Sequence, residues 1–275
     1  LGSRGLGDVY KRQLYKEYGI CCFKIDGLQI PTKTAEQNLR RLFDAVLAQT
    51  NHEVIFNLDA TAGRRGGYHY MNEYGNIFLE NRYTDWGNYY PYRTLRNLWM
   101  LSRYVPAEKM QIEFLNKWRN ADKYSTTDPF APARYSFDYL FAITLAAQPL
   151  AWMEASNLPE EAYATATLLK EYQPLQLQFH QGIILPIGEE PSGRSWTGFQ
   201  SIVSDTQGYL IIYREDNDIA KRTIDTWLPE GKKVTFTPLM GNGKKFVAEV
   251  GVQGKVRWRA NNKNSFSVYQ YQVKP

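Results

Sequence analysis

The sequence has 275 residues, of which 43% are hydrophobic and 22% are charged, and its formal net charge is +5. This composition supports a sizeable core and excludes a disordered chain, so we expect one or two globular domains. Thr144, Gln148 and Pro149 interrupt the longest apolar stretch, which argues against a membrane span, and the basic residues are scattered among acidic ones, which argues against a nucleic-acid partner.

The first thirteen residues differ from the rest of the sequence. They contain neither the apolar region of a signal peptide nor a helical or strand period. The string GDVYKRQ within them resembles translated sequencing-adapter read-through, so we predict that residues 1–13 are a non-native segment. On this interpretation the natural protein begins further upstream and the chain is a C-terminal fragment of it.

Alternating strands and helices are predicted between residues 14 and 180. A helix ends before Gly19, and the strand over 20–26 follows it; we interpret its two adjacent cysteines, Cys21 and Cys22, as buried, unpaired strand residues. Further strands are expected over 53–59, 76–81, 110–116 and 150–155, and helices over 34–50, 92–104, 135–147 and 159–172, the last ending before Pro174. This alternation indicates parallel βα units.

The pattern changes from about residue 185 to short alternating strands bounded by Gly, Asn and Pro, which predicts an antiparallel β-sandwich over 185–275. Its strands are expected over 196–203, 208–215, 233–239, 245–252, 255–260 and 265–273. Five βα-type strands are too few for a closed (β/α)8 barrel of about 250 residues, but they match its second part. The predicted fold class is therefore α/β then all-β, with a partial TIM barrel over 14–184; a complete small doubly wound domain is the alternative.

Functional side chains of a parallel barrel stand where its strands end. The first strand closes with Lys24 and Asp26, which share a face, and a neighbouring ammonium would keep Asp26 ionised, as a nucleophile needs. The second strand closes with Asn57 and Asp59 on one face, before a loop of small residues. These four positions are candidate catalytic or binding residues.

The third strand ends in Glu80 and is followed by Arg82, Asp85 and Trp86. This mixture of carboxylates, an arginine and an aromatic ring suits a sugar site. Retaining glycoside hydrolysis requires two carboxylates roughly 5 to 5.5 Å apart, and Asp26 with Asp85 or Glu80 are the candidate pair. The three histidines lack metal-ligand spacing, and no phosphate loop, nucleophile elbow or dinucleotide fingerprint occurs, so neither a metal nor a cofactor is implied.

These motifs resemble glycoside hydrolase clan D, the α-galactosidase-like enzymes of families 27 and 36. The strand FKID resembles the family's Lys-x-Asp nucleophile strand, and the segment ENRYTDW resembles its arginine-to-aspartate segment two βα units later. The resemblance implies that Asp26 is the nucleophile and Asp85 the acid/base. Arg82 precedes Asp85 by three residues where the family has four, so Glu80 remains the alternative acid/base.

The resemblance also implies an oligosaccharide substrate, with Lys24 and Arg82 as sugar ligands and Trp86 as a pocket wall. The activity expected is hydrolysis of terminal α-linked galactose or a related hexose, in a class that often works outside the cytoplasm. A barrel without its first three strands has half a site, so we expect the fragment alone to be inactive.

Two other functions are alternatives to this one. One is a sugar-binding protein without catalysis. The other makes the sandwich a separate carbohydrate-binding module, with Trp196, Trp227 and Trp258 as an aromatic platform, although packing of these rings in the core is favoured.

Overall fold

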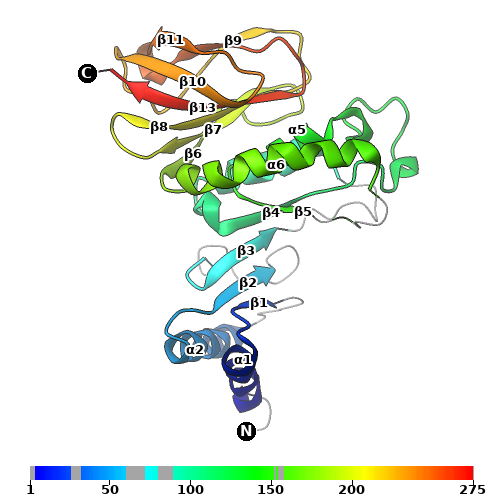
Figure 1. Ribbon diagram of the computed structural model, residues 1–275, viewed down its shortest axis with the longest axis vertical. Coiled ribbons are helices and arrows are strands. Elements are labelled where there is room, and N and C mark those ends of the chain that lie inside the picture. The colour runs from blue at the N-terminus through cyan, green and yellow to red at the C-terminus, as the bar shows by residue number, and fades with distance from the viewer. Residues whose placement is uncertain are drawn as a thin grey trace. The chain divides into compact units, whose positions relative to one another are not determined.

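A computed structural model describes residues 4–25, 32–59, 72–79, 89–151, 153 and 158–274 of the chain (Figure 1). The chain divides into two compact units. The first comprises Leu1–Glu80 with Lys109–Gln111, and the second comprises Asn81–Glu108 with Ile112–Pro275. No helix within the described ranges is both long and apolar enough to cross a bilayer.

The first unit contains helices α1 (Arg4–Tyr18) and α2 (Lys33–Gln49) and strands β1 (Cys22–Ile25), β2 (Ile55–Asp59) and β3 (Gly75–Leu79). Helix α1 ends as predicted: Gly19 has a φ of +67°, and its N–H donates to the Tyr15 carbonyl at 2.9 Å. The helix also includes residues 4–13, for which the sequence predicted no helical period. Helix α2 begins after Thr32, whose side chain accepts the N–H of Ala35.

The prediction that Cys21 and Cys22 are buried is wrong, because both side chains are exposed. Strand β1 is the first strand of its sheet and pairs only with β2 among the described strands. Cys22 also lies on the same face of β1 as Lys24, opposite to the Phe23 ring that packs near Phe56. Cys22 is therefore exposed because it lies on the polar face of an edge strand.

The second unit begins with α4 (Pro91–Leu101), β4 (Met110–Phe114), α5 (Phe137–Ala142), β5 (Gln148–Ala151) and α6 (Glu160–Phe179), β4 being shared between the units. Single 3-10 turns cover Ala107–Lys109, Ala121–Lys123, Pro132–Arg134 and Val252–Gly254. Helix α5 is shorter than predicted because the chain enters turns after Ala142. Helix α6 does not end before Pro174 as predicted; it continues through this proline, with Leu175 and Phe179 buried beyond it.

Strands β1 to β5 form one sheet in sequential order, and the pairs β1–β2 and β2–β3 are parallel. A doubly wound sheet would reverse its strand order at a switch point, so that alternative is wrong. Sequential βα units are those of a partial barrel, and the predicted fold class is confirmed.

The β-sandwich consists of a six-stranded antiparallel sheet in the order β11-β10-β13-β8-β7-β6 and a two-stranded sheet of β12 and β9. The strands are β6 (Ile183–Gly188), β7 (Trp196–Ile202), β8 (Gln207–Arg214), β9 (Lys221–Ile224), β10 (Lys233–Gly241), β11 (Phe246–Glu249), β12 (Val256–Arg259) and β13 (Ser265–Val273). The sequence analysis missed β6 and β9, which add one strand to each sheet.

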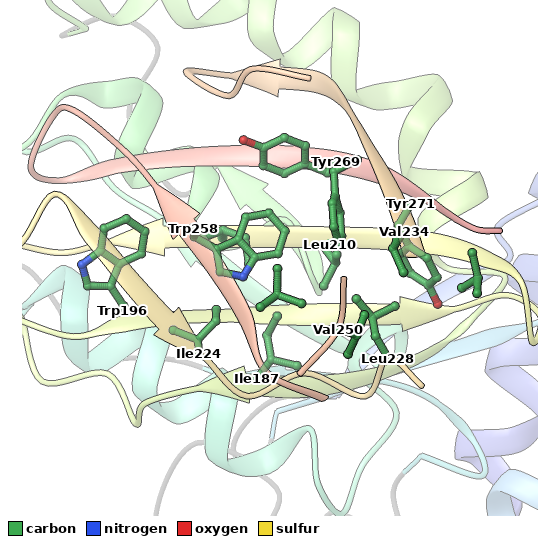
Figure 2. Close-up of a cluster of buried hydrophobic side chains, with 14 residues drawn as sticks. Ile187, Trp196, Leu210, Ile224, Leu228, Val234, Val250, Trp258, Tyr269 and Tyr271 are labelled. Atoms are coloured by element: carbon green, nitrogen blue, oxygen red, sulfur yellow. The ribbon is translucent and has the colours of Figure 1, made fainter. Parts of the chain in front are cut away.

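Figure 2 shows the hydrophobic core of the sandwich, where side chains from both sheets meet. Trp196 and Trp258 lie in this core with 1% and 2% of their surface exposed, whereas Trp227 is 57% exposed. The three tryptophans therefore form no common platform, and core packing is confirmed for Trp196 and Trp258.

Candidate active site

A row of polar side chains crosses the parallel strands of the first unit. Lys24 on β1 pairs in register with Asn57 on β2, and Asn57 pairs with Asn76 on β3. Side chains in register on parallel strands share a face. The Asn57 amide also donates a hydrogen bond of 2.6 Å to the Gln111 side-chain oxygen on β4. Sequence reasoning identified Lys24 and Asn57, and the structure adds Asn76 and Gln111 to the same row.

A second layer lies two residues further along the strands, where Asp59 on β2 pairs in register with Phe78 on β3. Asp59 is buried, with 4% of its surface exposed. The Lys24 ammonium stands 4.0 Å from the centroid of the Phe78 ring, a cation–π contact that fixes the long side chain toward the end of the strands. Three of the predicted site residues, Lys24, Asn57 and Asp59, thus share one face.

The opposite face of these strands is apolar and packs on α2. The Phe56 ring lies 4.3 Å from that of Phe43, which is fully buried in α2. Gly75 allows β3 to approach β2, because a Cβ there would stand 2.0 Å from the Phe56 carbonyl oxygen. The strands are therefore anchored on one side, and their polar side chains are positioned on the other.

The remaining predicted site residues lie outside the described residues. They are Asp26, Glu80, Arg82, Asp85 and Trp86. Their assignments stay predictions.

A second polar group, in the second unit, includes Glu113 on β4 and Tyr89. Glu113 is fully buried, and Glu113, Tyr124 and Tyr135 all lie near Tyr89. Burial and the Glu113 charge raise the pKa of Tyr89, and the Tyr89 backbone N–H donates to the Tyr124 hydroxyl at 3.1 Å. Burial raises the pKa of Tyr124 to about 12. The raised pKa values keep these hydroxyls neutral at physiological pH.

Lys117 follows the carboxyl end of β4 and is 7% exposed. Its ammonium donates to the Tyr135 carbonyl at 3.0 Å and forms an ion pair with Glu161 at 2.9 Å. The half-exposed Trp118 also donates its ring N–H to Glu161. Lys117 and Tyr124 line a hollow of about 290 Å³. Such a hollow, with a cation and an aromatic ring, is suited to polar ligands.

Sequence reasoning missed Glu113 and Lys117, although the signal was present. The same rule that identified Lys24 and Asp59 applies to the strand MQIEFLN, whose polar residues also approach its carboxyl end. For metals, no group of three His, Cys, Asp or Glu side chains comes together within the described ranges.

The parallel sheet and the antiparallel sandwich that follows it define a class of fold: part of a (β/α)8 barrel with a β-sandwich after it. Comparison with solved structures identifies the fold more closely as that of α-galactosidases of family 36. The galactosidase domain of an α-galactosidase–sucrose kinase matches 98% of this chain with a TM-score of 0.69 and 10% identity. A family 36 α-galactosidase from Geobacillus stearothermophilus, in complex with 1-deoxygalactonojirimycin, matches 98% with a TM-score of 0.66 and 11% identity.

The chain spans only 37% and 38% of the lengths of these two proteins. A putative α-N-acetylgalactosaminidase from Bacillus halodurans matches 95% of the chain, and 60% of its own length, with a TM-score of 0.52 and 12% identity. No family profile and no curated protein matches the sequence. The α-galactosidase-like resemblance is thus confirmed at the level of the fold.

Proposed function

We propose that the protein is a retaining α-glycosidase that removes terminal α-linked galactose, or a related hexose, from oligosaccharides. Asp26 attacks the anomeric carbon while Asp85 protonates the departing oxygen, which yields a glycosyl-aspartate. Asp85 then takes a proton from water, and this water hydrolyses the intermediate. Lys24, Asn57 and Asp59 hold the sugar hydroxyls, with Arg82, Trp86 and Glu80 completing the site.

The observation that carries this proposal is the shared polar face of β1, β2 and β3. Lys24, Asn57 and Asp59 stand there in two successive layers, on strands whose opposite face packs on α2. Asp26 follows Lys24 by two residues, so an extended strand would place its carboxylate on this same face. A sugar ring needs such a set of hydrogen-bonding groups beside a carboxylate.

The test measures turnover of a panel of nitrophenyl α- and β-glycosides. It uses the full product of the gene, because this chain covers only 37% of the length of the similar α-galactosidase domain. Asp26→Ala should lower kcat by more than about a thousandfold. Added azide should restore part of the activity and give the β-glycosyl azide, since azide replaces the missing nucleophile. The matched control is Asp205→Ala, because Asp205 is exposed in the β7–β8 turn.

The outcome against the proposal is full activity in the Asp26→Ala variant, or an inverted sugar product from the unmodified enzyme. Release of β-linked sugars alone would also overturn it. If a folded protein binds galactosides equally well before and after Asp26→Asn but turns over none of the panel, the protein is a sugar-binding protein without catalysis.

The acid/base is assigned by comparing Asp85→Ala with Glu80→Ala. The acid/base variant should keep activity on substrates with a dinitrophenyl leaving group, which needs no protonation, and azide should give the α-glycosyl azide. We infer that Asp85 shows this pattern. The same pattern in Glu80→Ala would transfer the role to Glu80.

A further inference from the structure

The β-sandwich contains a hollow that the proposed reaction does not use. It has a volume of about 320 Å³ and lies where the β10–β11 hairpin meets β12 and β13. Asn242, Lys244 and Phe246 line it from the hairpin side, and Arg257 and Arg259 line it from β12. Its size lies at the lower end of the range for small-molecule sites.

The lining of this hollow is strongly cationic. Lys244, Arg257 and Arg259 contribute three positive charges, and no carboxylate lines it among the described residues. The register of β12 against β9 places Lys221 opposite Arg259, which adds a fourth positive charge to the same side of the ribbon.

The positive charges of the hollow are not neutralised locally. Lys263, elsewhere on the sandwich, forms ion pairs with Asp216 and Asp218 at 3.0 and 2.8 Å. Within the described part of the chain, neither Arg257 nor Arg259 forms an ion pair; the Arg259 side chain instead donates to the Asn261 side-chain oxygen at 3.1 Å. The hollow therefore attracts an anion.

Aromatic rings form the apolar part of the lining. Phe246 is half-buried and Tyr269 is buried, and their rings meet edge to face at 5.9 Å. The backbone of Lys244 hydrogen-bonds the Tyr269 hydroxyl, and Phe246 packs at 5.2 Å against the buried Trp258. Because the rings are held by the sandwich core, which Figure 2 shows around Trp258 and Tyr269, they form a rigid wall.

We propose that this hollow binds an acidic saccharide, a sugar carrying carboxylate or sulfate groups. The guanidinium groups of Arg257 and Arg259 pair with the anionic group, since planar guanidinium forks match carboxylate and sulfate oxygens. The Phe246 ring contacts the apolar face of the sugar, and the Asn242 and Asn261 amides hydrogen-bond its hydroxyls. A free inorganic anion would gain nothing from contact with the aromatic rings, which a sugar ring can stack on. A nucleic acid would need an extended row of basic residues along its phosphate backbone, and the hollow does not provide one.

The test is calorimetric titration of the intact chain with trigalacturonic acid, a sulfated galactotriose and neutral galactotriose. At least one of the two anionic saccharides should bind at least tenfold more tightly than neutral galactotriose. Its affinity should fall as the salt concentration increases. The double variant Arg257→Gln/Arg259→Gln should lose at least tenfold in affinity for the anionic probe. Phe246→Leu should weaken binding of the saccharide while leaving binding of inorganic sulfate unchanged.

The matched control is Arg41→Gln, because Arg41 is an exposed arginine of α2 outside the hollow. Both arginines of the hollow are exposed on β12, so their replacement should leave the thermal unfolding temperature unchanged. Equal affinity for charged and neutral saccharides, or an equal loss in Arg41→Gln, would overturn the proposal. So would inorganic sulfate or a DNA dodecamer that binds as tightly as the acidic saccharides. Because the readout is binding, the result does not depend on glycosidase activity.

Discussion

The buried carboxyl group of Glu215 should make the stability of the sandwich depend on pH. It follows β8 and is only 1% exposed. One carboxylate oxygen accepts the backbone N–H groups of Ser192, Gly193 and Ser195 at 3.0, 2.8 and 2.8 Å. Burial raises the pKa of Glu215 to about 7, and the three donors offset only part of this effect.

The sign of the effect follows from proton binding. Between pH 4.5 and 7 the folded protein retains a proton at Glu215 that the unfolded chain has lost, so the free energy of unfolding falls as pH rises through this window. A folded pKa near 7 against an unfolded value of 4.5 corresponds to about 3 kcal/mol, present below pH 4.5 and lost above pH 7. Glu215→Gln has no charge to desolvate and should lack this dependence.

Urea unfolding of the two proteins between pH 4.5 and 8 measures the effect. The free energy of unfolding of the unmodified protein, relative to that of Glu215→Gln, should fall by about 3 kcal/mol across this range. The control is Glu249→Gln, an exposed carboxylate of β11, for which the difference should stay flat. A flat difference for Glu215→Gln would refute the reasoning, because the three backbone donors would then balance burial, and so would a difference that rises with pH, because the donors would then outweigh it.

Three further substitutions test the site and the core. Under the proposed function, Lys24→Ala should lower kcat/KM on the preferred α-glycoside by roughly 10- to 100-fold, measured by steady-state kinetics, because it would remove a charged hydrogen bond to the sugar. Lys117→Met should lower the free energy of urea unfolding by about 1–3 kcal/mol, since it leaves the Tyr135 carbonyl without its donor, whereas exposed Lys170→Met should not. Trp258→Ala should cost about 3–5 kcal/mol and Trp227→Ala about 1 or less, in the same assay, because only Trp258 is in the core.

The fold class could be predicted from the sequence because the spacing of apolar residues differs between the two parts of the chain. Apolar spacing on α2 puts Phe43 and Val46 on one buried face, and alternation on β12 puts Trp258 inside between two exposed arginines. Element ends were less predictable. Pro174 predicts a helix end, but the burial of Leu175 and Phe179 beyond it comes from tertiary packing, which no local pattern contains.

The site could be predicted only where a local rule applied. Lys24, Asn57 and Asp59 were found because they alternate at strand ends, and this rule needs no knowledge of distant contacts. The contact of Asn57 with Gln111, 54 residues away, depends on how the strands pair, as does the exposure of Cys22 on an edge strand. The burial of Glu215 could not be predicted at all, because the backbone N–H groups that bind its carboxylate belong to a loop some twenty residues earlier in the chain.

The polar face of β1 to β3 is itself an argument for a binding site. Fold stability alone favours apolar side chains at buried strand positions, because a buried amide or carboxylate costs free energy that hydrogen bonds only partly recover. Asn57 is 8% exposed, and its side-chain oxygen has no hydrogen-bond partner among the described residues. Asp59, two residues further, is buried as well. A strand that is apolar toward α2 but keeps an amide and a carboxylate on its other face departs from the best core, and under the proposed function a sugar hydroxyl would donate to the Asn57 side-chain oxygen.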